Sequence, residues 1–289
     1  MPIIEEKKGA LRDFKTAQNI TSALRDISAL KLKEIREEVK RGKTYYDEIE
    51  DMYRLIKYYA TEKEIKLTHQ ERNNKIPKIL TVAVTSNKRF YGSLNHDVMV
   101  SFLAYLEKAK NLKNEAHDFY IVGRTGREFI RGISIDKKVR FFEFRDDDPT
   151  AYETITFVDT TRQYDHVLMF YPKFVNVFKQ EITVTDITYV SETRKTKPLE
   201  IEYIFEPELG EIFWFFDTQV RYILFNQTML EIKLARLAAR LVRMNVSEQN
   251  ARAAVRATQL EIRKTVALLN NMKLLETFSG MKQWRKKGA

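Results

Sequence analysis

Proline is confined to the start and the middle of this 289-residue chain. None occurs between Pro2 and Pro77, and none follows Pro207. Because proline disrupts the interior of a helix, each end of the chain can form one long helix, and the segment between them carries the turns. No apolar run approaches the roughly 20 residues that a membrane-spanning helix needs. The absence of cysteine excludes a disulfide scaffold.

The two proline-free stretches have the periodicity of amphipathic helices. In the first, apolar residues recur mostly every three or four positions and predict a helix over about 10–58: Leu11, Phe14, Ala17, Ile20, Leu24, Ile27, Ile35 and Val39. The stretch 208–278 ends with the same spacing: Ile262, Val266, Leu269, Met272, Leu275 and Phe278. Helices of this length, about 75 and 105 Å, cannot bury their stripes against a compact domain. We therefore predict that they pair as an antiparallel coiled coil; the alternative is separate helices in a larger bundle.

The middle of the chain has the patterns of strands. β-Branched or alternating segments predict strands at 79–85, 118–122, 166–170, 182–190 and 199–204, and a helical pattern covers 98–109. This order predicts an α/β sheet with a late hairpin at an antiparallel edge. The predicted fold class is a Rossmann-like α/β domain plus a long antiparallel coiled coil. The predicted domains are an N-terminal helix at 1–60, a linker at 61–76, the α/β domain at 77–206, and a C-terminal helix with a basic tail at 207–289.

No set of residues predicts a catalytic site. The sequence lacks the P-loop, H-E-x-x-H and G-x-S-x-G motifs, and its four histidines are scattered. Gly123 and Gly126 follow a predicted strand, and a structural turn explains them better than a phosphate site, since a dinucleotide fingerprint has three glycines. The acidic run Asp146–Asp148 could attract a cation, but such runs are more often solvated loops. We therefore predict a non-catalytic chain with no metal and no cofactor.

Positive charge is concentrated at the C-terminal end. Residues 231–289 contain 13 Lys and Arg against four acidic residues, which is +9 of the formal net charge of +10. A basic helix of this kind favours an acidic partner, such as nucleic acid, anionic lipid or acidic protein loops. Nucleic acid is the weaker choice, because only Phe278 and Trp284 offer aromatic rings for stacking on bases in the terminal helix.

Six segments carry a family resemblance. They are Ile20–Leu24 with Ala29 and Lys31, Thr85–Asn95, Val122–Gly126 with Phe129, Tyr171–Asn176, Tyr203–Pro207, and Ala239–Met244 with Asn250 and Ala251. In this order and spacing they resemble the gamma subunit of F-type ATP synthases over the whole chain. The chain departs from that pattern at Asn271 and Lys273, where a threonine and a glutamate are usual, and in its glycine-rich loop, which here reads Arg89–Ser93. The plant-type regulatory cysteine pair is missing.

The resemblance implies a non-catalytic rotor subunit. In that family the two terminal helices form a shaft inside a ring of three alpha and three beta subunits, and its rotation is coupled to ATP synthesis or hydrolysis. The implied contacts with this head are Ile20, Thr21, Ala23, Leu24, Lys31, Arg240, Met244, Asn250 and Lys273. The implied motif loops of the α/β domain contain Ser86, Lys88, Gly92, Leu94, Asn95, Gly123 and Gly126.

Further partners follow from the same resemblance. They are an epsilon-like subunit and a membrane rotor ring or another load, with the complex peripheral at the cytoplasmic face of the cell membrane. Neither nucleic acid nor a membrane span is implied. The alternative is a coiled-coil interaction protein whose basic helix is the working surface, with nucleic acid among its ligands. The coupling ion and the direction of catalysis stay open.

Overall fold

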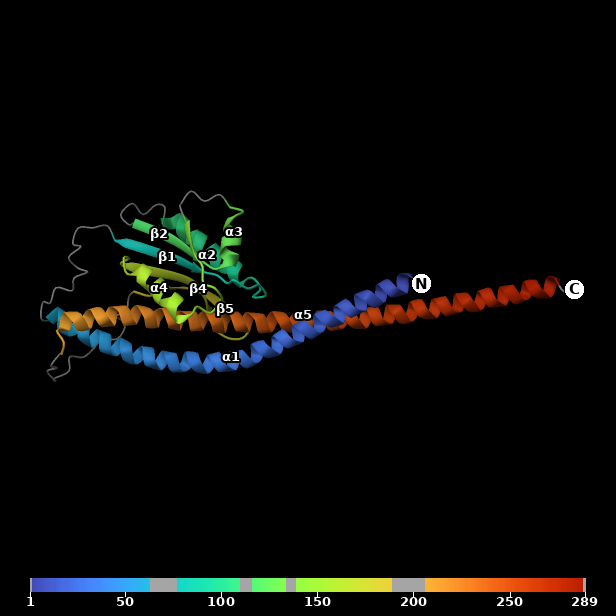
Figure 1. The fold of residues 1–289 in the computed structure, drawn as a ribbon, viewed down its shortest axis with the longest axis horizontal. Coiled ribbons are helices and arrows are strands. Elements are labelled where there is room, and N and C mark those ends of the chain that lie inside the picture. Colours follow the sequence, from blue (N-terminus) through green and yellow to red (C-terminus); the bar gives the residue numbers. More distant parts are fainter. Residues whose placement is uncertain (1, 63–76, 110–115, 134–138, 189–205, 288–289) are drawn as a thin grey trace. The chain divides into compact units, whose positions relative to one another are not determined.

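The computed structural model describes residues 2–62, 77–109, 116–133, 139–188 and 206–287 (Figure 1). Two long helices, α1 (Pro2–Glu62) and α5 (Leu209–Lys287), flank the other elements in the sequence. These are β1 (Lys78–Val84), α2 (Leu94–Ala109), β2 (Ala116–Val122), α3 (Arg124–Ile130), β3 (Val139–Phe142), α4 (Ala151–Thr161), β4 (His166–Phe174) and β5 (Gln180–Asp186). The chain divides into a sheet unit, Ser28–Arg240, and a helical unit, Met1–Ile27 with Leu241–Ala289.

The sheet unit is built on one mixed sheet with the strand order β3-β2-β1-β4-β5. The first four strands of this unit are parallel to their neighbours, and β5 pairs antiparallel with β4 at the edge. The central strand β1 is buried along six of its seven residues, as expected for a parallel strand that is covered on both faces. The predicted α/β sheet with an antiparallel edge is therefore confirmed.

Helices cover both faces of this sheet. Because side chains alternate along a strand, Leu80 and Val82 of β1 pack with Phe157 of α4 and Phe225 of α5. Ala83 points to the opposite face and belongs to the cluster formed with α2, which includes Val98, Met99 and Phe102. The second part of α1 joins the first cluster through Tyr53 and Ile56. The sheet core thus fixes the segments of α1 and α5 that lie in the sheet unit.

The two long helices run antiparallel in each unit. In the sheet unit Ile35 packs with Leu234 and Leu237, while Tyr53 and Ile56 belong to a cluster with residues 220–225 of α5. In the helical unit Lys7 pairs with Glu261 at 3.2 Å, and Arg25 pairs with Glu248. Higher residue numbers in α1 thus meet lower numbers in α5. The predicted helices at 10–58 and 208–278 and their antiparallel pairing are confirmed.

The predicted burial of both apolar stripes is wrong in part. Phe14, Ile20 and Ile27 are 38–55% exposed, because contact between only two helices covers a narrow seam on each. Further exposed members are Met272, Leu275 and Phe278 of α5. Since Lys7 already pairs with Glu261, α1 begins too late to cover the last turns of α5.

Some sequence predictions fall outside the described residues. These are the strand at 199–204, the end of the strand at 182–190, and most of the linker at 61–76. The sequence patterns did not predict β3, α3 or α4. The domain bounds proposed above remain a prediction. Among the described helices, none combines the length and the apolar character needed to cross a membrane.

Candidate functional site

The loop after β1 is held by its own side chains. Ser86 donates its N–H to Asn95 Oδ1 (3.1 Å), and Asn95 Nδ2 donates back to Ser86 Oγ (2.8 Å). The Ser86 hydroxyl in turn donates to the carbonyl of Lys88 (2.6 Å). Three predicted motif residues therefore form one network that ties the end of β1 to the start of α2.

The same loop turns back toward α5. Phe90 and Gly92 both have positive φ, 78° and 65°, which glycine adopts freely and phenylalanine rarely does. The turn brings Tyr91 and Leu94, both buried, against Ala239 of α5. This loop is thus a contact between the sheet and α5 within the sheet unit.

Gly123 and Gly126 are needed because α3 approaches β1 closely. Gly123 has φ +95°, and a Cβ there would lie 2.3 Å from the Thr85 carbonyl oxygen; a Cβ on Gly126 would lie 2.7 Å from Thr85 Oγ1. The N–H groups of the first three residues of α3 donate to Asn87 Oδ1, Ser86 O and Thr85 Oγ1 at 2.9–3.0 Å. Because these donors already have partners, the structure supports the structural turn rather than a phosphate cradle.

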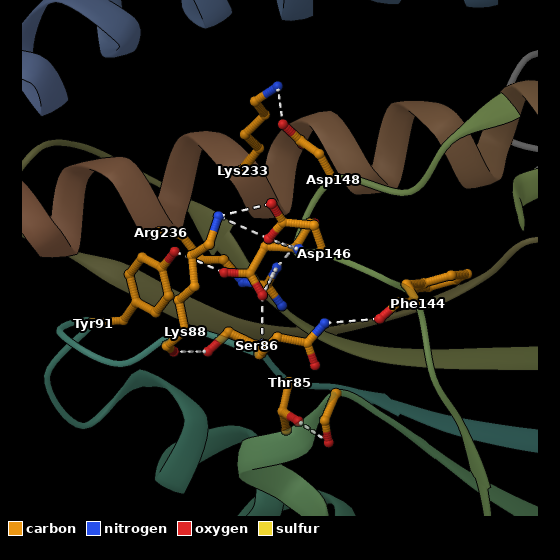
Figure 2. Close-up of polar contacts among 12 residues, drawn as sticks. Thr85, Ser86, Lys88, Tyr91, Phe144, Asp146, Asp148, Lys233 and Arg236 are labelled. Carbon is orange, nitrogen blue, oxygen red and sulfur yellow. Dashed lines mark hydrogen bonds and ion pairs between the residues drawn. The ribbon is translucent and has the colours of Figure 1, made fainter.

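The acidic run, which lies between β3 and α4, binds cationic side chains. Asp146 pairs with Lys88 at 2.7 Å, and Asp148 pairs with Lys233 of α5 at 2.6 Å (Figure 2). The hydrogen bond from Lys88 and a backbone N–H lower the pKa of Asp146. Among the described residues, no group of His, Asp or Glu is arranged to hold a metal ion. Asp146 and Asp148 are more than half exposed, so the run is a solvated loop whose ion pairs also connect it to α5 and to the β1 loop.

Tyr91 connects the middle carboxylate of the run to α5. Its hydroxyl donates to Asp147 Oδ2 (2.9 Å) and accepts a hydrogen bond from Arg240. The Arg240 guanidinium also lies over the Tyr91 ring, 4.7 Å from its centroid, a favourable cation–π geometry. Burial raises the pKa of Tyr91 to about 12, and the Asp147 charge adds to the shift. Arg240, predicted as a contact with the head, thus has an intrachain partner.

Arg236 is the most deeply buried cation of this group. Its side chain is 5% exposed, and its Nη1 lies 3.9 Å from Asp147 Oδ1 and 3.4 Å from the Asp147 carbonyl. Burial lowers the pKa of Arg236. Within the part of the chain that the structure describes, its Nε and Nη2 atoms have no hydrogen-bond partner, nor does Nε of Arg240.

In the helical unit, a second ionic cluster joins the two long helices. Glu248 of α5 is 2% exposed and accepts hydrogen bonds from Arg25 of α1 and Arg252 of α5. Hydrogen bonds and charge from Asp26 and Glu248 raise the pKa of Arg25, with the Asp26 hydrogen bond as the largest cause. A buried carboxylate fixed in this way favours one register of the helix pair, because a shift along the axis would separate it from Arg25 of α1.

The predicted head contacts are distributed over both units. Exposed positions are Ile20, Ala23, Asn250 and Lys273 of the helical unit and Lys31 of the sheet unit. Leu24 and Thr21 are half-buried, and Thr21 donates its hydroxyl to Ala17 O (2.8 Å). Met244 is 4% exposed and packs inside the helical unit. The exposed positions thus belong to two separate units, and Met244 is not among them.

The sequence patterns did not predict that Tyr91, Asp147, Arg236 and Glu248 are members of polar clusters. One signal was available for Arg236. Lys233, Arg236 and Arg240 are three and four residues apart, so they share one face of a helix. The positive charge of that face is complementary to the acidic run Asp146–Asp148. For Glu248 no local pattern distinguishes it from an exposed glutamate.

Comparison with known proteins gives one consistent family. The family model described as ATP synthase matches residues 4–266. The ATP synthase gamma chain of Cytophaga hutchinsonii is 24% identical over 291 residues, covering 97% of this chain and 98% of that protein. The gamma chain of Albidiferax ferrireducens is 25% identical over 296 residues, covering 96% and 97%.

Solved structures of mitochondrial ATP synthases are also similar. The mitochondrial ATP synthase central stalk and c-ring of Tetrahymena thermophila gives a TM-score of 0.49 at 16% identity, covering 80% of this chain and 99% of that one. A chain of the Euglena gracilis mitochondrial enzyme gives 0.49 at 13% identity, covering 88% and 94%. The match of the family model over most of the sequence carries the assignment. The chain therefore belongs to the gamma-chain family of F-type ATP synthases.

Proposed function

We propose that the helical unit is the part of this gamma chain that turns inside a ring of alpha and beta subunits. As a member of its family, the chain is a non-catalytic rotor subunit of the central stalk, and the ATP chemistry takes place on partner subunits. The proposal adds which surfaces of the chain meet the ring. It rests mainly on the end of α5, which extends beyond the part that α1 covers.

This end of α5 is both apolar and basic. Six large apolar side chains there are 54–68% exposed: Leu268, Met272, Leu274, Leu275, Phe278 and Met281. Exposed apolar surface of this extent on one helix favours a protein partner that covers it. Exposed cations lie on the same part of the helix, including Arg263, Lys264 and Lys273. An apolar sleeve with acidic loops in the ring would complement this surface.

Among the predicted head contacts, the exposed ones suit this role best. Ile20, Ala23, Asn250 and Lys273 all lie in the helical unit and have side chains open to a partner. Met244 is buried, so we assign it to packing between the helices. We base both assignments on how exposed each side chain is in this chain alone.

Co-expression with alpha and beta subunits tests the proposal. Native mass spectrometry should find a single copy of this chain in each alpha–beta ring. Removing residues 270–289 should weaken assembly, because most of the exposed apolar side chains are lost. A chain that never joins the ring, or a truncated chain that assembles as well as the full one, would contradict the proposal.

A charge reversal gives a sharper test. Lys273→Glu should weaken assembly, since it would place a carboxylate beside acidic loops. Lys108→Glu on α2 is the matched control, because Lys108 is exposed in the sheet unit, and it should leave assembly unchanged. Equal assembly of both variants would mean that Lys273 faces solvent.

We also propose the remaining partners and the location. The sheet unit would meet an epsilon-like subunit and a membrane rotor ring or another load, at the cytoplasmic face of the cell membrane. Cell fractionation, with and without the membrane sector, tests this. The chain should pellet with membranes only when the ring is present, and recovery in the soluble fraction in both cases would contradict it.

A further inference from the structure

A polar cavity that is partly open to solvent lies in the sheet unit, where the β1 loop and the acidic run meet α5. It has a volume of about 90 Å³. Five cationic side chains line it: Lys31, Lys88, Lys233, Arg236 and Arg240. The three carboxylates of the acidic run line it too, so five positive charges face three negative ones.

The carboxylates do not neutralise all of these cations. Asp146 and Asp148 are each engaged by a lysine, at 2.7 and 2.6 Å. Asp147 accepts hydrogen bonds from Tyr91 and from a backbone N–H of the β1 loop. Its contact with Arg236 is long, 3.9 Å. Lys31, Arg236 and Arg240 therefore share one remaining carboxylate, Asp147, and the lining keeps a surplus of two positive charges.

Arg236 has N–H donors that no acceptor among the described residues of the cavity satisfies. Although the side chain is 5% exposed, its Nε and Nη2 have no hydrogen-bond partner among the described residues, and Arg240 Nε is in the same state. Buried donors without an acceptor are costly. Guanidinium groups bind oxyanions through charge-assisted hydrogen bonds.

We propose that this cavity binds a small oxyanion of the phosphate or sulfate type. The oxyanion would accept hydrogen bonds from Arg236 and Arg240 and balance the excess positive charge. The volume agrees with this class of ligand: one water needs roughly 10–15 Å³ on this measure, so 90 Å³ holds a small polyatomic ion. Pockets for larger ligands usually have volumes of about 300–1,000 Å³, so this cavity is too small to enclose ATP. The site shares no residue with the proposed contacts of the helical unit.

Binding is measured on the full-length chain alone, without alpha and beta subunits, so the result is independent of the rotor proposal. The melting temperature and calorimetric heats are followed as potassium phosphate replaces potassium chloride at constant ionic strength. We expect a saturable rise in melting temperature with phosphate and none with chloride. ATP should bind no more tightly than phosphate. The absence of any phosphate-specific effect would show that the cavity holds only water and would overturn the proposal.

Three variants locate the site. Arg236→Gln should weaken phosphate binding about tenfold or more, by loss of a charge-assisted contact. Lys31→Gln should weaken phosphate binding by a smaller factor. Because Lys31 is exposed, this variant should fold. It therefore tests the site even if circular dichroism shows that Arg236→Gln does not fold. Arg256→Gln, an exposed arginine of α5 outside the cavity, should bind as the wild type does. The assignment would be overturned if Lys31→Gln and a folded Arg236→Gln both bound phosphate as the wild type does. Equal losses of phosphate affinity in all three variants would overturn it too.

Discussion

Replacing Glu248 by glutamine removes the buried charge that joins α1 to α5 in the helical unit. The two arginines would then face an amide with one acceptor and two donors. Breaking a fully buried ion pair costs about 3–5 kcal/mol, and an exposed pair contributes about 0–1 kcal/mol. Glu248 is 2% exposed, but Arg25 is 29% and Arg252 52% exposed, so both arginines can turn toward water. We therefore expect a loss of about 2 kcal/mol.

Hydrogen exchange measures this loss where it occurs. About 2 kcal/mol corresponds to roughly a 30-fold increase in the local opening equilibrium. Amides of peptides covering 18–30 and 244–256 should therefore exchange roughly 30-fold faster in Glu248→Gln. Amides of α2 in the sheet unit should be unchanged and serve as an internal reference.

A matched substitution separates this effect from a general loss of charge. Glu276→Gln removes an exposed carboxylate from the same helix and should leave exchange within about twofold of the wild type, because exposed charges contribute little. If the two Glu248→Gln peptides keep wild-type protection, Glu248 does not hold the helices together and the reasoning fails.

Three further predictions concern the sheet unit. Gly123→Ala should lower the free energy of unfolding, measured by urea denaturation, by about 3 kcal/mol or more, since a positive φ and a contact of 2.3 Å with Thr85 O oppose a Cβ. Gly9→Ala is the control. A Cβ at Gly9 meets no neighbour within 4 Å, so this variant should be neutral or stabilising. The free energy of unfolding should fall as the pH drops below about 4. Hydrogen bonds from Lys88 and from the Arg145 backbone lower the folded-state pKa of Asp146 and of Glu153 below their unfolded values of about 3.9 and 4.3. Urea titrations between pH 6 and 3 should show this fall, and a flat profile would refute it. Tyr91→Phe should lower the melting temperature by a few degrees through loss of the hydroxyl bridge between Asp147 and Arg240, whereas Tyr152→Phe, at a position 79% exposed, should not.

The sequence determined the elements that depend on local pattern. The absence of proline allowed two long helices, and their spacing of apolar residues predicted both. A continuous β-branched run predicted the buried strand β1. The position of the motif glycines also followed from local signals, because a turn after a strand requires backbone freedom at Gly123.

Only the tertiary structure decided which side chains meet. Arg240 and Tyr91 are 149 residues apart, and Arg25 and Glu248 are 223 residues apart, so no local period relates them. The exposure of Ile20 and Ile27 likewise depends on how narrow a seam the partner helix covers. Charge counting identified a basic C-terminal helix, but whether a cation pairs, lines a cavity or faces a partner depends on its position on that helix and on what packs against it.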